Sequence, residues 1–302
     1  MNRLTRDTLA GFVPAVVTPF SATGEIMEDA FAEIIEWTIG NGAQGICTAG
    51  DNGESWALTP EERKRLTRIA VDKAAGRVPV IAGASAPKAS QTIAYARDAV
   101  EAGADGILLL PQTYVLKATR EELLRRFESV AKAVNVPIVA YNSPRRTGIE
   151  LTPDDLQAIM GVAPIVGLKE SSREFFHHSH ILQRFRDRIS VLVGPCHYIL
   201  PGIALGARGF IATGPEFLGT DAGRLVKIGQ QAPDPAYRLL HHKLTVIYQT
   251  LMGIGTWPAA LKAGLQMIGQ PAGIPRDPVL PLSGGDLDRL RRVLAELELL
   301  PR

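Results

Sequence analysis

The sequence predicts a (β/α)8 TIM barrel of the α/β class, with a small helical appendage at its C-terminal end. Short, almost wholly apolar segments indicate parallel strands that are covered on both faces. Helical segments alternate with them, and eight such strands can be counted along the chain. A length of 302 residues would suffice for two domains, but α/β barrels commonly use it for one. We expect the barrel in residues 1–230 and a C-terminal helical region in residues 231–302.

The expected strands follow two sequence patterns. In the first pattern a helix ends in glycine and a short turn leads into a buried strand, as in GAQGICTAG (42–50), GADGILLLP (103–111) and GARGFIATG (206–214). The second pattern is a plain apolar run, as in VPVIAG (78–83), VPIVAY (136–141), APIVGLK (163–169) and ISVLVG (189–194). GFVPAVVTPF (11–20) supplies the first strand and completes the count of a barrel.

Helical patterns fill the intervals between the strands. TPEERKRLTRIAVDKAA (59–75) and TREELLRRFESVAKAV (119–134) begin with a threonine cap and carry apolar residues at helical spacing. After residue 230 the strand pattern stops, and helical stretches follow at about 235–252, 257–269 and 286–299. The alternative fold, an open doubly wound sheet, would need a glycine-rich phosphate turn that TPFSATGE (18–25) matches poorly.

Composition narrows the class of protein. The formal net charge is +2 and there is no basic block, so we expect no nucleic-acid partner. No apolar stretch approaches the ~20 residues of a membrane span, and the N-terminal segment lacks the apolar core of a signal peptide, so we expect a cytoplasmic protein. Cys47 and Cys196 are interpreted as buried thiols. The six histidines show no matched acidic partners, so we expect neither a metal nor another cofactor.

Lys169 is the first candidate for chemistry, because it ends an apolar strand where burying an ammonium group is expensive. Strand alternation predicts Ile165, Gly167 and Lys169 on the inner face, with Gly167 leaving room for a substrate or a ring. Val166 and Leu168 would face the helices. Burial lowers the pKa of a lysine, and a neutral amine can attack a carbonyl to form a Schiff base. A structural lysine paired with a carboxylate is the alternative.

Two further features are expected at the same rim of the barrel. Alternation brings Tyr141 to the carboxyl end of the strand adjacent to that of Lys169, where active sites of this fold are built. Its phenol could carry protons, although it could equally be a core tyrosine with a bonded hydroxyl. In TAGDNGES (48–55), Gly50 and Gly53 flank two polar residues, so the turn could expose backbone N–H groups to an anion or be an ordinary turn.

Together these segments resemble the dihydrodipicolinate synthase / N-acetylneuraminate lyase family of class I, Schiff-base-forming lyases. GDNGES (50–55) is similar to its G-x-x-G-E motif, YNSPRRTG (141–148) to its Y-N-x-P-x-R-T-G motif, and GLKES (167–171) to its lysine strand. The resemblance extends over almost the whole chain, from PAVVTPF (14–20) to RDPVLPLS (276–283). It implies that Lys169 forms the imine and that Tyr141 relays protons.

The resemblance also implies a binding site. Backbone N–H groups of Asp51 and Asn52 would hold the carboxylate of pyruvate or a related 2-oxo acid, and Gly194 and Ile211 would line the pocket. Tyr114 is similar to the tyrosine that the family lends across a dimer interface. The partners implied are a 2-oxo acid, a small aldehyde and further copies of the chain, as a homotetramer or dimer.

Asp51 departs from the family pattern, because dihydrodipicolinate synthases have a threonine there whose hydroxyl relays protons. A carboxylate cannot relay protons in the same way, and it would repel an anionic substrate unless it points away or acts as a base. Arg146, by contrast, fits the arginine that grips the carboxylate of the second substrate, although a solvated loop arginine is the alternative.

The leading functional hypothesis is a pyruvate- or 2-oxo-acid-dependent Schiff-base lyase, with 4-hydroxy-tetrahydrodipicolinate synthase as the nearest named activity. An aldolase or dehydratase of 2-oxo-3-deoxy sugar acids or hydroxyproline-derived imino acids would use the same imine and would better explain Asp51. A catalytically inactive barrel that acts as a sensor or scaffold is the alternative from another class. The presence of Lys169, Tyr141 and Arg146 argues against it.

Overall fold

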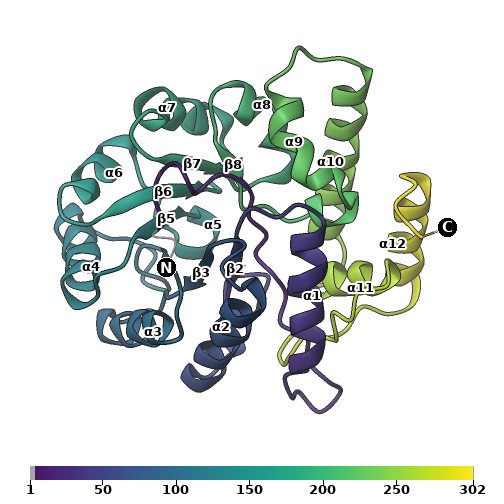
Figure 1. The fold of residues 1–302 in the computed structure, drawn as a ribbon, viewed down its shortest axis with the longest axis horizontal. Helices are drawn as coiled ribbons and strands as arrows, with labels where there is room; N and C mark the ends of the chain where they lie inside the picture. Colours follow the sequence, from purple (N-terminus) through teal and green to yellow (C-terminus); the bar gives the residue numbers. More distant parts are fainter. Residues whose placement is uncertain (1–3, 302) are drawn as a thin grey trace.

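Eight parallel strands form one curved sheet, with helices on its outer side (Figure 1). The computed structural model describes residues 4–301. The strands are β1 (Gly11–Phe12), β2 (Ile46–Thr48), β3 (Val80–Gly83), β4 (Gly106–Leu109), β5 (Ile138–Asn142), β6 (Ile165–Glu170), β7 (Ser190–Val193) and β8 (Gly209–Phe210). Their order is β1-β8-β7-β6-β5-β4-β3-β2, and a parallel bridge between Ala15 and Cys47 joins the first strand to the second. The predicted barrel is confirmed.

The helices cover the barrel as the alternating pattern predicts. They are α1 (Glu28–Gly40), α2 (Pro60–Ala74), α3 (Ala89–Glu101), α4 (Arg120–Ala133), α5 (Pro144–Thr147), α6 (Pro153–Met160), α7 (Phe175–Phe185), α8 (Ile199–Ala204) and α9 (Asp221–Gly229). Thr59 and Thr119 begin α2 and α4, and each closes a reciprocal capping box with a glutamate three residues later. The apolar stripes of the helices pack on the outer face of the sheet, while a smaller cluster that includes Val13, Val139 and Leu192 fills the barrel interior.

The C-terminal residues form α10 (Pro235–Gly253), α11 (Ala259–Met267) and α12 (Gly284–Glu296), close to the predicted stretches. These helices lie together at one side of the barrel (Figure 1). Helix α10 packs on the single turn η2 (Cys196–Tyr198) that follows β7, and the Cys196 thiol donates a hydrogen bond to the carbonyl of Leu244 in α10. Helix α10 is therefore positioned at the carboxyl ends of the strands. None of the helices between residues 4 and 301 is long and apolar enough to cross a membrane.

Strand β6 contains a bulge that the sequence pattern did not reveal. Strand β5 pairs with Ile165 and then with Gly167, so Val166 has no partner. The extra residue reverses the alternation before it: Ile165 packs in the outer layer, and Val166 packs against the interior cluster. The prediction that Ile165 shares the inner face with Lys169, and that Val166 faces the helices, was therefore wrong. Beyond the bulge, Gly167 and Lys169 face inward as predicted.

The expected role of Gly167 also needs correction. A Cβ atom at this position would lie 2.5 Å from Cδ2 of Leu9 and 2.9 Å from the carbonyl oxygen of Ser190. The missing side chain thus makes room for Leu9, which belongs to the interior cluster, and not for a substrate. The glycine allows the barrel floor to close beneath Lys169.

Candidate active site

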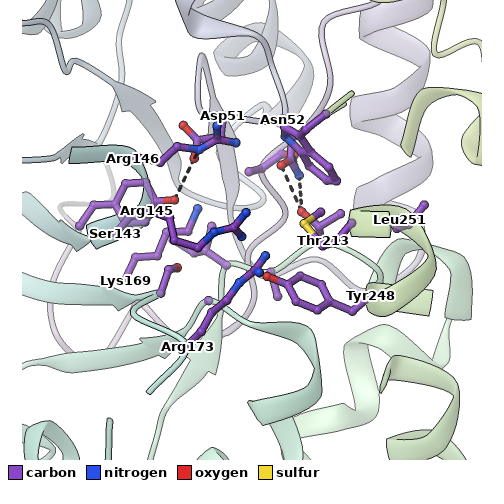
Figure 2. A pocket seen from close by; sticks show the side chains of 18 of the residues that line it. Asp51, Asn52, Ser143, Arg145, Arg146, Lys169, Arg173, Thr213, Tyr248 and Leu251 are labelled. Atoms are coloured by element: carbon purple, nitrogen blue, oxygen red, sulfur yellow. Dashed lines mark hydrogen bonds and ion pairs between the residues drawn. The ribbon is translucent and has the colours of Figure 1, made fainter. Parts of the chain in front are cut away.

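A cavity of about 370 Å³ opens at the carboxyl ends of the strands (Figure 2). This is within the range of small-molecule sites. Its walls are formed by the segments that follow β1, β2, β5, β6, β7 and β8, and by α10 with the residues after it. All the predicted site residues except Tyr114 line it: Asp51, Asn52, Tyr141, Arg146, Lys169, Gly194 and Ile211.

Lys169 lies at the bottom of the cavity and is only 6% exposed. It pairs in register with Tyr141 on β5, and its Nζ lies 4.2 Å from the centre of the Tyr141 ring. Burial lowers the pKa of Lys169 from its ordinary value, and the negative charge of Asp51 opposes this shift in part. Within residues 4–301 no carboxylate forms an ion pair with Lys169, and the nearby Asp51 pairs with Arg146 instead. The structure therefore does not support the alternative of a charge-paired structural lysine.

Asp51 joins Tyr141 and Arg146. The Tyr141 hydroxyl donates to Oδ2 of Asp51 at 3.0 Å, and Nε of Arg146 donates to the same oxygen at 3.1 Å. Burial, together with the charge of Asp51, raises the pKa of Tyr141 well above its ordinary value, so the phenol keeps its proton. The carboxylate thus does not face the cavity unpaired, because a guanidinium and a phenol share its charge.

The glycine-flanked turn after β2 is held from two sides. The side-chain amide of Asn52 donates to the carbonyl of Ala15 and to the hydroxyl of Thr213, both at 2.9 Å. These bonds fix the turn to the first strand segment and to the loop after β8. Among the described residues, the backbone N–H groups of Asp51 and Asn52 have no protein acceptor. No protein group therefore competes with an anion for them, and their expected role in holding a carboxylate stays a prediction.

Glu54, which ends this turn, is anchored by the C-terminal region. Its side chain is fully buried, forms an ion pair with Lys262 of α11 and accepts a hydrogen bond at 2.8 Å from the backbone N–H of Arg276. Burial lowers the pKa of Lys262 to about 8, although Glu54 opposes the shift. Sequence analysis missed this contact because its partners lie more than 200 residues apart.

Three cavity residues with a charged or phenolic side chain were not singled out from the sequence. Arg145 is in the short helix α5, Arg173 follows β6, and Tyr248 belongs to α10. The doubled arginine in PRRTG was the only local signal for Arg145. No periodic pattern marks Arg173 or Tyr248, since one lies in a loop and the other reaches the site only through the packing of α10.

Tyr114 lies outside the cavity in the single chain. It is 88% exposed, and Val115 and Leu116 beside it are also exposed. Its φ of 75° is in the left-handed region, which is uncommon for a residue other than glycine. Cys47 and Cys196 are free, fully buried thiols, as predicted. In the part of the chain described here, no group of three or more His, Cys, Asp or Glu side chains is placed to hold a metal ion.

Comparison with known proteins identifies the family. The profile of the dihydrodipicolinate synthetase family matches residues 8–297. The chain belongs to this family. The predicted membership is therefore confirmed, and with it the class of enzyme, a lyase that forms a Schiff base through a lysine.

Individual members of the dihydrodipicolinate synthetase family align along nearly the whole chain. The 4-hydroxy-tetrahydrodipicolinate synthase of Syntrophus aciditrophicus is 33% identical over 284 residues, which cover 94% of this chain and 97% of that protein. The crystal structure of dihydrodipicolinate synthase from Aquifex aeolicus superimposes with a TM-score of 0.90 at 32% identity, covering 97% of this chain and 100% of that one. A prophage protein of the family from E. coli, determined in complex with pyruvate, has a TM-score of 0.90 at 28% identity, covering 96% and 99%.

Proposed function

We propose that this enzyme forms an imine between Lys169 and the carbonyl carbon of pyruvate or a related 2-oxo acid, and then makes or breaks a bond at the adjacent carbon. The observation that carries the proposal is the buried Lys169 amine, 4.2 Å from the centre of the Tyr141 ring in a cavity open to small molecules. The E. coli and Acinetobacter baumannii members of the family that were determined with pyruvate support this choice of substrate. The nearest named activity is that of the 4-hydroxy-tetrahydrodipicolinate synthases.

The chemistry follows from the protonation states of the site. A neutral Lys169 amine attacks the carbonyl carbon, and loss of water leaves an iminium ion. The iminium withdraws electrons from the adjacent carbon, which loses a proton to give an enamine, and the enamine then attacks an aldehyde. The protonated Tyr141 phenol is the group best placed to deliver and recover protons, because it lies against the amine and donates to Asp51.

The remaining predicted residues bind the 2-oxo acid. Backbone N–H groups of Asp51 and Asn52 would hold its carboxylate at the turn after β2, while Gly194 and Ile211 form the wall beside the imine. A Cβ atom at Gly194 would lie 1.7 Å from Oγ of Ser171 and 2.6 Å from the carbonyl of Glu170. Any larger residue at position 194 would therefore disturb the loop that follows Lys169.

One observation favours the second candidate, an aldolase or dehydratase of 2-oxo-3-deoxy sugar acids or hydroxyproline-derived imino acids. Arg146 is bonded to Asp51 and is therefore less available to grip the carboxylate of an aldehyde substrate. Through the Tyr141 hydroxyl, Asp51 can accept a proton from the substrate and return it, which is the task of a base in retro-aldol cleavage or dehydration.

Assembly into a homodimer or homotetramer is part of the proposal. Tyr114, Val115 and Leu116 are 88%, 56% and 69% exposed in one chain, and a second copy would cover this apolar segment. Three further expectations stay predictions. They are a small aldehyde as second substrate, a boundary at residue 230 between the barrel and the C-terminal region, and a cytoplasmic location.

Borohydride reduction in the presence of pyruvate tests the imine. We expect inactivation, with the reduced adduct on the peptide that contains Lys169, because only an imine is fixed in this way. Lys169→Ala should abolish the adduct, whereas Lys88→Ala, which removes an exposed lysine outside the cavity, should not. Circular dichroism would establish that both variants are folded. An adduct on another lysine, or full activity of folded Lys169→Ala, would refute the assignment.

A further inference from the structure

The outer part of the cavity holds two cations that the imine chemistry does not use. Within residues 4–301, neither Arg145 nor Arg173 forms an ion pair with an aspartate or glutamate, whereas Arg146 pairs with Asp51. Arg145 and Arg173 are close enough to repel each other, and this repulsion adds to burial in lowering the pKa of Arg145. Figure 2 shows the Arg173 guanidinium at the hydroxyl of Tyr248, and the charge of Arg145 also acts on that hydroxyl.

The backbone holds Arg173 in this position at an energetic cost. Its φ is 67°, in the left-handed region that residues other than glycine rarely adopt. The hydroxyl of Tyr198 donates to the Arg173 carbonyl at 2.9 Å, and the guanidinium lies over the Tyr248 ring with its carbon 5.0 Å from the ring centre. A left-handed arginine that is fixed at both ends beside a cavity is the kind of strain that collects at ligand sites.

The balance of charge in the cavity points to the ligand. Asp51 is the only carboxylate among the described cavity residues, and it is shared between Arg146 and Tyr141. The turn after β2 already offers backbone N–H groups to the first carboxylate of a 2-oxo acid. Arg145 and Arg173 therefore have no carboxylate of the described cavity to pair with. Two neighbouring guanidinium groups can bind the carboxylate of a ligand through charge-assisted hydrogen bonds.

We infer that Arg145 and Arg173 form a subsite for a second carboxylate, so that the enzyme acts on 2-oxo acids with a carboxylate at each end. This inference rests on the proposed imine function and names its substrate class. Tyr248 contributes a further hydroxyl donor and positions Arg173 by packing against its guanidinium. In this enzyme Arg146 organises Asp51, and the anion-binding role passes to Arg145 and Arg173.

Matched pairs of 2-oxo acids test the inference without knowledge of the natural substrate. The probes are 2-oxoglutarate against 2-oxopentanoate, and 2-oxoadipate against 2-oxohexanoate, each differing mainly in the distal carboxylate. The readout is the concentration that gives half-maximal borohydride trapping on Lys169. For at least one chain length we expect the diacid to trap at a concentration lower by about tenfold or more, the effect of one charge-assisted hydrogen bond.

Variants assign the preference to residues. Arg145→Gln and Arg173→Gln should each lose most of the diacid preference while trapping pyruvate like the parent, because pyruvate has no distal carboxylate. Arg97→Gln is the matched control, since it removes the same charge from an exposed helix position outside the cavity, and it should keep the preference.

The outcomes separate the inference from the proposed function. Trapping of pyruvate without any preference for the diacids, or a preference that survives both arginine variants, would overturn the subsite alone. A failure to trap any 2-oxo acid would refute the proposed imine function, and the subsite inference with it.

Discussion

Replacement of Asp51 by asparagine distinguishes a catalytic carboxylate from a structural one. Asp51→Asn removes the charge and keeps the size of the side chain. The carboxylate accepts hydrogen bonds from Tyr141 and Arg146 on the same oxygen, and an amide oxygen could still accept them. The variant therefore changes the charge and the capacity to take up a proton far more than it changes the geometry.

The two hypotheses predict effects of different size. If Asp51 only orients Tyr141, weakening that bond costs about 0.5–1.5 kcal/mol, which is at most roughly tenfold in rate. The pair with Arg146 adds little, since the Arg146 side chain is 42% exposed and such pairs contribute about 0–1 kcal/mol. If Asp51 is the base that exchanges protons with Tyr141, its loss should cost roughly 10²–10⁴-fold in turnover. We expect the larger effect.

The pH dependence of imine trapping provides an independent readout. The charge of Asp51 raises the pKa of Lys169 against the lowering by burial, so its removal should lower that pKa further. Trapping requires the neutral amine, and its acid limb should therefore move to lower pH in Asp51→Asn. The same substitution removes a charge that raises the pKa of Tyr141, so the alkaline limb of turnover should also fall.

The assay compares Asp51→Asn and Asp51→Thr with the parent enzyme. Turnover is measured with pyruvate plus aspartate semialdehyde and with a 2-oxo-3-deoxy sugar acid, after trapping has established that the imine still forms. A dipicolinate synthase relay would keep or gain activity on aspartate semialdehyde in Asp51→Thr, because the variant restores the hydroxyl that the family uses. Equal activity of both variants and the parent on every accepted substrate would refute a catalytic role for Asp51.

Two further predictions concern stability. Glu54→Gln should lower the free energy of unfolding in urea by about 3–5 kcal/mol, because it leaves Lys262 as a buried cation without its counter-ion. The double variant Glu54→Gln with Lys262→Met should recover most of that loss. Equal losses in the single and the double variant would contradict the pairing. Burial raises the pKa of Glu216 to about 7, so the folded chain keeps a proton that the unfolded chain releases above about pH 4.5. The free energy of unfolding should therefore fall by roughly 3 kcal/mol as pH rises from 4.5 to 7. Glu216→Gln should remove this pH dependence, while its amide oxygen can still accept a hydrogen bond from the N–H of Gly214. The same dependence of stability on pH in the variant and the parent would contradict the assignment.

The sequence was sufficient for those parts of the fold and site that depend on local periodicity. Parallel strands covered on both faces are short and apolar, so VPIVAY and ISVLVG could be recognised one by one. Because neighbouring strands of a barrel run in parallel, their carboxyl ends meet at one rim, which brings Lys169 and Tyr141 together. The glycine-flanked turn after β2 could be placed at the same rim for the same reason.

Features that depend on contacts between distant segments could not be predicted in this way. The bulge at Val166 arises from its pairing with β5, and a run of apolar residues gives no sign of which one is skipped. The space beside Gly167 is filled by Leu9, from a segment near the start of the chain. Tyr248 reaches the cavity because α10 packs on the turn after β7, a contact that the helical pattern of α10 does not encode.

The departure at Asp51 and the unpaired arginines have a common electrostatic explanation. A carboxylate beside the imine would repel an anionic substrate if nothing compensated for it, but Arg146 bonds to the same oxygen that faces Tyr141. That bond ties Arg146 to Asp51 and Tyr141, the two residues proposed to exchange protons, and it leaves Arg146 less able to hold a substrate anion. Arg145 and Arg173 add positive charge to the same cavity. In the proposed subsite they bind the second carboxylate, and Asp51 exchanges protons through Tyr141. On this proposal, the division of the two tasks between different residues explains how one site can contain a carboxylate and still bind a doubly charged acid.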